Sequence, residues 1–360
     1  MTETGGRGGA QRTVCFPMPR KLVVIGDLNG DDDALAMMLR ALGLTSRDGS
    51  WTAEGVHLVQ LGDVVNRGAQ CRRALERLMR LEVEAEALGS RVTTLLGNHE
   101  AMVTLGNLAW CSPEELLEHA PADARVRYEM RRAQAVYELL VHATDRDRTA
   151  PIVGAVRAWE EANVPGRDAY REAMGPRGAL GRFVRRLPVA IRVGPVLLVH
   201  GGLSLPFAEL GLEGIEREAQ ATWARVPASE ADLSPDDLLL AEDGPLWHRA
   251  YALGDEAAME PELRGALRSS GASTMIVGHT RTDQVPGGRR GHPVARFGGR
   301  LICADVGIGS SGGAPAAVFI EKNIIWCWRP EERKRRLCTL PHPLDGEVTS
   351  PGTLLQRNRA

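Results

Sequence analysis

Five short apolar runs in this sequence each end in a glycine-containing turn that carries a potential metal ligand. The side chains are two aspartates, an asparagine and two histidines: Asp27, Asp63, Asn98, His200 and His279. Short apolar runs that stop at such turns predict buried strands. In open α/β sheets, functional side chains gather outside the carboxyl ends of the strands. We therefore expect these five residues to meet in one site.

Carboxylate and amide oxygens mixed with imidazole nitrogens suit Mn, Zn or Fe better than Ca. A central carboxylate such as Asp63 can bridge two ions about 3.5–4 Å apart, an arrangement that generates a hydroxide near neutral pH and clamps a displacement at phosphorus. Arg67, four residues after Asp63, offers a planar guanidinium to phosphate oxygens, although it could also form a structural salt bridge. The residue set predicts hydrolysis of a phosphate ester.

The motifs Gly-Asp-x-x-Gly, Gly-Asp-x-x-x-Arg-Gly, Gly-Asn-His-Glu, His-Gly-Gly and Gly-His-Thr together resemble the calcineurin-like metallophosphoesterases, in particular the phosphoprotein phosphatase branch. Stretches 244–249 and 305–313 are similar to bacterial Shewanella-like phosphatases. The resemblance implies an α/β fold with a calcineurin-like two-sheet β-sandwich flanked by helices. It also implies a binuclear metallophosphatase with two divalent metal ions, Mn²⁺ first and Fe, Zn or Mg as alternatives.

Carried over to this chain, the resemblance implies a role for each motif residue. It places one ion on Asp27, Asn29 and Asp63, and a second on Asp63, Asn98, His200 and His279. His99 becomes the general acid that protonates the leaving oxygen, and Arg67 and Arg249 hold the phosphate. A packed or surface histidine remains the alternative for His99, and a helix-end cation remains the alternative for Arg249.

The sequence departs from the family pattern at three places. Asn29 replaces a histidine, and because Asn-Gly is also a turn signal, Asn29 is either a turn residue or a weaker ligand that prefers Mn or Mg. Asn66 replaces an aspartate of the eukaryotic branch, and an amide raises an imidazole pKa less than a carboxylate does, so we expect His99 to lose its proton at lower pH. Leu96 and Gly97 precede Asn98 at the place where protein phosphatases carry an arginine. The absence of this arginine weakens the inference that the substrate is a protein.

Composition narrows the possible partners and surroundings. The chain has 360 residues, 43% hydrophobic and 25% charged, with a net charge of −2. No overall field therefore favours nucleic acid or an anionic membrane, and no apolar run is long enough to cross a bilayer. The six cysteines lack CxxC spacing, which favours free thiols in a reducing cytoplasm. We expect a cytoplasmic enzyme whose partner is a phosphorylated protein or small molecule.

The order of apolar and polar segments predicts one principal domain. Residues 1–19 read as a disordered tail, 20–329 as the metallophosphoesterase domain, and 330–360 as a polar C-terminal tail. Between about 102 and 187 the strand signals disappear, which predicts a helical insertion near the mouth of the site. Strand and helix alternate before this insertion, which predicts a parallel sheet. Asn323 fits a hairpin turn between the last two strands.

Three functions are compatible with these residues. The preferred interpretation is hydrolysis of phosphomonoesters, with a protein Ser/Thr or Tyr phosphatase as the version that the resemblance implies. A dinucleoside polyphosphate or other small-molecule phosphate hydrolase is the alternative. A non-catalytic binder is the third, because Asn29 and Asn66 both depart from the catalytic pattern.

Overall fold

The computed structural model describes residues 13–141, 149–225, 234–309, 314–332 and 334–344. Within these ranges, twelve strands form two six-stranded sheets. The first sheet has the order β12 (Arg335–Thr339), β11 (Ile324–Trp328), β10 (Ala317–Glu321), β2 (Lys21–Ile25), β3 (Val56–Gln60) and β4 (Arg91–Thr94). The second has the order β1 (Cys15–Phe16), β5 (Ala190–Val193), β6 (Val196–Val199), β7 (Thr274–Val277), β9 (Leu301–Cys303) and β8 (Val294–Arg296).

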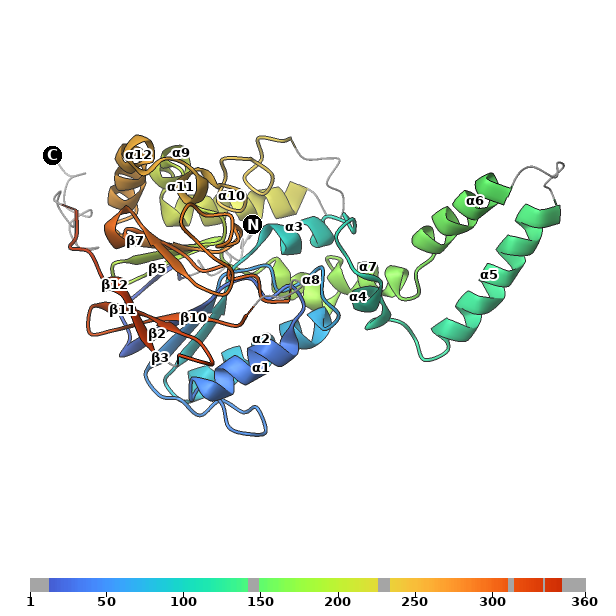
Figure 1. Cartoon of the computed structure of the whole chain (residues 1–360), viewed down its shortest axis with the longest axis horizontal. Coiled ribbons are helices and arrows are strands. Elements are labelled where there is room, and N and C mark those ends of the chain that lie inside the picture. Colours follow the sequence, from blue (N-terminus) through green and yellow to red (C-terminus); the bar gives the residue numbers. More distant parts are fainter. Residues whose placement is uncertain (1–12, 142–148, 226–233, 310–313, 333, 345–360) are drawn as a thin grey trace, which may run out of the picture.

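In the first sheet, β2, β3 and β4 are parallel neighbours, as the sequence predicts. The connections are two amphipathic helices, α1 (Asp32–Ala41) and α2 (Cys71–Ala87), which lie together on one side of the sheet (Figure 1). Asp31 starts α1, because its side chain accepts the Ala34 N–H. Parallel pairing brings the residues after β2, β3 and β4 to the same edge of the sheet.

The second sheet repeats this arrangement with β6, β7 and β9, which are also parallel. A fully buried apolar cluster with members from both sheets, among them Leu22, Val59, Leu198 and Ile276, joins them into a sandwich. Helices lie on the far side of the second sheet: α9 (Leu205–Glu209), α10 (Gly211–Arg225), α11 (Ala250–Leu253) and α12 (Glu256–Ser269). A single 3₁₀ turn, Phe297–Gly299, joins β8 to β9. The structure is the expected two-sheet sandwich flanked by helices.

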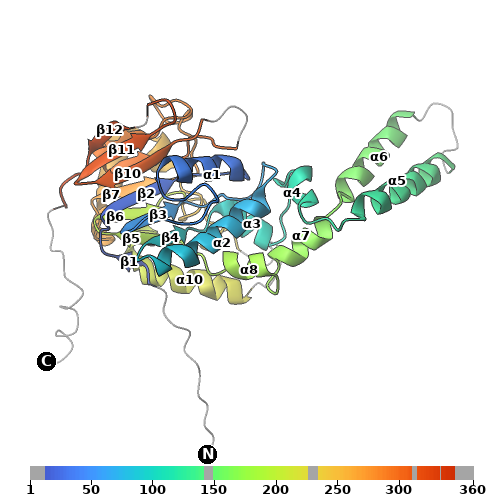
Figure 2. The same cartoon turned by 90° about the horizontal axis from the view of Figure 1, so that it is seen from below.

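Six helices lie between β4 and β5 in the described residues. They are α3 (Asn98–Thr104), α4 (Pro113–Leu117), α5 (Ala124–Val141), α6 (Thr149–Ala162), α7 (Arg167–Met174) and α8 (Ala179–Val184). The first of them, α3, begins at the site itself. The pair α5 and α6 extends away from the sandwich in both views (Figures 1 and 2), so the long part of this insertion projects outward from the two sheets.

Two short strands lie in segments that the sequence analysis assigned to tails. β1 pairs with β5, and β12 pairs with β11 through Cys327–Arg335 and neighbouring positions. β12 forms the outer edge of its sheet, where charged residues such as Arg335 and Arg336 are tolerated because one side faces solvent. Residues 1–12 and 345–360 of those tails lie outside the described residues. Lys322 and Asn323 both have positive φ and form the expected hairpin turn. No helix in the described ranges is long and apolar enough to cross a membrane.

Candidate metal centre

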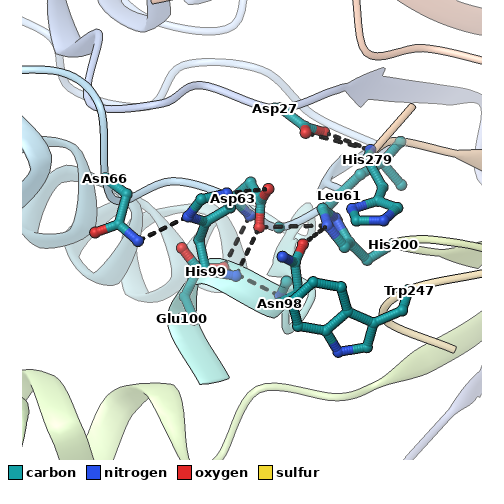
Figure 3. Close-up of polar contacts among 12 residues, drawn as sticks. Asp27, Leu61, Asp63, Asn66, Asn98, His99, Glu100, His200, Trp247 and His279 are labelled. Carbon is teal, nitrogen blue, oxygen red and sulfur yellow. Dashed lines mark hydrogen bonds and ion pairs between the residues drawn. The ribbon is translucent and has the colours of Figure 1, made fainter. Parts of the chain in front are cut away.

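The two sheets bring the five sequence-predicted ligand residues to one buried site. Asp27 follows β2, Asp63 follows β3, Asn98 follows β4, and the two histidines, His200 and His279, follow β6 and β7. The side chains of these residues point toward one another (Figure 3). Potential ligand atoms of Asp63, His200 and His279 all lie within 4.8 Å of one another.

Close contact between the loops depends on glycine at two positions. A Cβ on Gly62 would lie 2.6 Å from the main-chain nitrogen of Gly97, and a Cβ on Gly97 would lie 2.3 Å from that of Asp63. Any other residue at either position would push the two loops apart. Asp63 and His279 themselves adopt left-handed φ values of 54° and 60°, which cost about 1 kcal/mol or more per non-glycine residue. The fold therefore keeps strained backbone where these side chains converge.

His200 directs its Nε2 at two oxygen atoms. Its Nδ1 lies 2.8 Å from the Leu61 carbonyl oxygen, which only accepts, so Nδ1 carries the proton. In the neutral ring, Nε2 then faces Asn98 Oδ1 at 2.9 Å and Asp63 Oδ1 at 3.3 Å. Burial alone lowers the pKa of His200, but the negative charge of Asp63 outweighs it and raises the pKa to about 9. In the metal-free protein a proton on Nε2 can serve these two oxygens, and once that proton is lost the three atoms are all acceptors that could coordinate one cation.

His279 adds a further acceptor to this cluster. It is 6% exposed, and its Nε2 has no hydrogen-bond partner among the described residues. Its main-chain N–H donates to both oxygens of Asp27, at 3.0 and 3.2 Å. Burial, and then the charge of His200, lower the pKa of His279 to about 2, so its ring is neutral and able to coordinate. The donor set therefore fits divalent ions of the Mn, Fe and Zn type.

Burial raises the pKa of Asp27 well above its usual range, and the charges of Asp305 and Asp63 add to this effect. The pKa of Asp63 is low, because the positive charges of His200 and His99 outweigh its burial. In metal-free protein the raised pKa values favour a proton on His200 and make Asp27 easier to protonate, whereas Asp63 keeps its negative charge. A bound cation would displace those protons.

His99, at the start of α3, lies against Asp63 and between two polar side chains. Its Nε2 is 3.7 Å from Asp63 Oδ2 and 3.0 Å from a guanidinium nitrogen of Arg67. Its Nδ1 is 2.7 Å from the side-chain nitrogen of Asn66. A guanidinium only donates, so Nε2 accepts and the neutral ring carries its proton on Nδ1. A half-turn of the Asn66 amide gives that proton an oxygen acceptor. Burial and then Arg67 lower the pKa of His99, against the opposing charge of Asp63.

The remaining predicted residues, Asn29, Arg67 and Arg249, line the same site. Asn29 has a left-handed φ of 46°, and its Oδ1 accepts from Arg67 at 3.3 Å. Its Nδ2 donates to the Ile308 carbonyl at 3.4 Å. Asn29 is therefore a turn residue by its backbone, and its side-chain oxygen also points into the site. Burial lowers the pKa of the Arg249 guanidinium, and the nearby carboxylates of Asp27 and Asp305 oppose that shift.

Sequence reasoning missed the part played by Glu100. Its buried carboxylate accepts the main-chain N–H groups of Asp63, Val64, Val65 and Gly97 at 2.8–3.0 Å. It therefore fixes the loop after β3 against the start of α3. Burial, and then the charge of Asp63, raise the pKa of Glu100 to about 7. The sequence signal that could have predicted this role was the position of Glu100 as the last residue of the Gly-Asn-His-Glu motif.

Asp305 and Trp247 are the other side chains that sequence reasoning left without a part in the site. Asp305 comes shortly after β9, just as Asp27 and Asp63 come shortly after β2 and β3. The apolar run before Asp305 could have predicted this position. Asp305 is 1% exposed, and its Oδ1 accepts the Gly307 N–H at 2.9 Å. Trp247, expected in the core, is half-buried, and its ring is nearly perpendicular to that of His279, with 5.9 Å between the two ring centroids. Figure 3 shows the two side chains beside each other.

A family model described as calcineurin-like phosphoesterase matches residues 20–282. The chain belongs to this family. Calcineurin-like phosphoesterases use divalent metals, and the candidate metal ligands of this chain include Asp63, His200 and His279.

Named relatives of this calcineurin-like phosphoesterase include two Shewanella-like protein phosphatases. The chain is 26% identical over 266 residues to Shewanella-like protein phosphatase 1 of Plasmodium berghei, a match that covers 72% of this chain and 61% of that protein. It is 27% identical over 276 residues to Shewanella-like protein phosphatase 2 of Arabidopsis thaliana, with 74% and 68% covered. The chain thus spans less than two thirds of the length of the first relative.

The solved structures of similar fold include the cold-active protein-tyrosine phosphatase of a psychrophilic Shewanella species. The two chains share 24% identity with a TM-score of 0.65, over 91% of this chain and 82% of the other. The structure of a point mutant of a cold-active protein tyrosine phosphatase has a TM-score of 0.66 at the same identity and coverage. At this level of identity the comparison establishes the shared fold.

Proposed function

We propose that the protein is a binuclear metal-dependent phosphatase that hydrolyses phosphomonoesters in proteins. The cluster of acceptor atoms around Asp63 carries this proposal. Nε2 of His200, Oδ1 of Asn98 and the unpartnered Nε2 of His279 converge on the Asp63 carboxylate, and the candidate ligand atoms of Asp63, His200 and His279 lie within 4.8 Å of one another. Protein substrates are proposed because two relatives are named protein phosphatases.

Two ions would divide the ligands between them. Asp27, Asn29 and Asp63 would hold the first, and Asp63, Asn98, His200 and His279 would hold the second. When bound, the ions supply Lewis acidity that activates water and offsets the charge of the phosphate. We propose Mn²⁺ for the Asn29 position, because an amide oxygen is a harder ligand than an imidazole.

The side chains of Arg67 and Arg249 are suited to hold the phosphate. In the described part of the chain, Arg67 bonds to Asn29 and His99, and neither guanidinium lies within 4 Å of a carboxylate. Both can therefore donate to phosphate oxygens without breaking an ion pair. Arg249 is also half-buried, where a charged hydrogen bond is stronger than in bulk water.

His99 is suited to deliver a proton to the leaving oxygen. Arg67 donates to His99 Nε2 in the metal-free arrangement, so Nε2 has no room for a proton there. A phosphate that draws Arg67 away frees Nε2, which can then take a proton and pass it on. Because Nε2 lies 3.7 Å from Asp63 Oδ2, this proton is held beside the centre of the reaction.

The test is hydrolysis of an aryl phosphate by metal-stripped protein that is titrated separately with Mn, Mg, Zn and Fe. We expect no turnover without metal, recovery with at least one ion, and loss of that recovery in Asp63→Asn. His57→Gln is the matched control, because His57 is a buried histidine that bonds Thr93 away from the site. Turnover that persists in fully stripped protein, or in Asp63→Asn, would refute the proposal.

A further inference from the structure

A cavity of about 1090 Å³ opens beside the metal centre. Its walls come from the loop after β6, from the segment before α11, and from α12. The lining includes Ser204, Trp247, His248 and Arg249, together with three acidic residues, Glu242, Asp243 and Glu262. Two of these side chains, Ser204 and His248, are buried and each keeps a polar atom without a hydrogen-bond partner among the described residues.

Two lining residues connect the cavity directly to the site. Trp247 has one edge against the His279 ring, and the charge of Arg249 acts on the pKa values of His99 and His279. A Cβ on Gly201, next to His200, would lie 2.9 Å from the main-chain nitrogen of Trp247. The wall of the cavity is therefore packed on the loop that carries a metal-ligand candidate, and a phosphate held by Arg249 would lie at the cavity's border.

The charge of the cavity is opposite to that of the phosphate-binding residues. Residues 234–248 contain four aspartates and glutamates and no lysine or arginine. Asp237 is paired with Arg225, whereas Glu242 and Asp243 are exposed and have no ion pair with any described residue. Glu262 accepts the Tyr251 hydroxyl at 3.2 Å, a neutral partner that leaves its charge in place. Arg249 is the one lysine or arginine among the described lining residues.

We infer that this cavity receives a basic segment of a phosphoprotein, an arginine or lysine within a few residues of the phosphorylated side chain. The inference rests on the proposed function, since the phosphate must be anchored at Arg249. Three unneutralised carboxylates attract a cation and repel an anion at the same place. The indole of Trp247 adds an aromatic surface beside which a guanidinium can stack. A dinucleoside polyphosphate would bring several negative charges close to these carboxylates, so we expect it to bind less well than a basic segment.

The test uses the full chain loaded with Mn²⁺ and three phosphopeptides of identical length. They differ only in the flanking residues, which are arginine, glutamine or glutamate, and each is made with phosphotyrosine and with phosphoserine. An exposed ion pair changes affinity by a factor of about two to five. Two such contacts predict a kcat/KM about tenfold higher for the arginine peptide than for the glutamine peptide, and lower again for the glutamate peptide.

Two double variants decide whether the cavity is responsible. In Glu242→Gln/Asp243→Asn we expect the ratio of the arginine to the glutamine peptide to fall to about two. The matched control is Glu54→Gln/Glu86→Gln, which removes two exposed acidic residues from the side of the other sheet and should keep the ratio of wild type. The wild-type ratio should also shrink as salt is raised from about 0.05 M to about 0.5 M, because exposed charges are screened.

Failure of this inference and failure of the phosphatase proposal give different results. Hydrolysis of the aryl phosphate with equal rates for all three peptides would overturn the basic-segment inference and leave the phosphatase intact. A tenfold ratio that survives in Glu242→Gln/Asp243→Asn would also overturn it, as would faster turnover of a dinucleoside polyphosphate than of any peptide. If nothing is hydrolysed, fluorescence anisotropy with the same peptides gives the affinity ratio, which tests the cavity independently of turnover.

Discussion

Replacing Asn66 by aspartate tests how the surroundings of His99 set its proton affinity. The Asn66 side chain lies 2.7 Å from His99 Nδ1, and His99 is 3% exposed. Burial lowers the pKa of His99, and the Asn66 amide offers little to oppose that shift because it carries no charge. Asn66→Asp would place a carboxylate against the same nitrogen, where it stabilises the imidazolium.

The expected size of the effect follows from the contact. An opposite charge at this distance raises a pKa by about 1–3 units, and one unit corresponds to 1.36 kcal/mol. The new carboxylate is itself buried, which weakens its ionisation, so we expect a rise of about 1–2 units for His99. Because a general acid must be protonated to act, the alkaline limb of kcat/KM should move upward by the same amount.

Two measurements separate this effect from simple damage. The pH profile of kcat/KM is recorded for wild type, Asn66→Asp and Asn66→Ser, and the serine variant should show no upward shift. Histidine ring resonances of the Zn-loaded protein, titrated by NMR, give the pKa of His99 directly. An alkaline limb and a His99 pKa that both remain at the wild-type values in Asn66→Asp would refute the coupling between these residues.

Three further predictions follow from the site. His200 has a raised pKa of about 9, so its contribution to the stability of metal-free protein is complete below about pH 6.5 and is lost as pH rises through 9, about 3 kcal/mol at most; urea unfolding at pH 6 and pH 9 should show this loss, and a pH-independent stability would contradict it. Asn29→His should raise the affinity for the more weakly bound ion about tenfold, measured by calorimetry, because an imidazole replaces a neutral amide; two tightly held ions in wild type would contradict a weak site. Glu100→Ala leaves four main-chain N–H groups without their acceptor and should cost roughly 3–5 kcal/mol of unfolding free energy, measured in urea; a loss under about 1 kcal/mol would show that water replaces the carboxylate.

Much of the site could be predicted because it follows the carboxyl ends of parallel strands. Each strand is a short apolar run, and the polar residue that follows it lies at the carboxyl edge that the parallel strands share. The parallel pairing of β2 with β3 and the convergence of Asp63, His200 and His279 could therefore be predicted from the sequence. The hairpin at Asn323 was predictable for a different reason, because the turn signal lies within the residues that form the turn.

Other features depend on contacts between segments that are distant in the sequence. Glu100 bonds a loop more than thirty residues earlier, and no local pattern specifies which loop it meets. β12 is an edge strand rich in arginine, so its composition resembles a solvated tail although it pairs with β11. The partners of Arg67, namely Asn29 and His99, likewise follow from the meeting of three loops.

The central claim is that the residues around Asp63 form a two-ion centre required for phosphate ester hydrolysis. The most direct test measures bound metal per chain and turnover of an aryl phosphate together, as metal is returned to stripped protein. We expect a first equivalent of metal to bind with little turnover and turnover to rise with a second, more weakly bound equivalent. Asp63→Asn should lose both the binding and the turnover. Full turnover at one equivalent, or turnover in Asp63→Asn equal to wild type, would contradict the central claim.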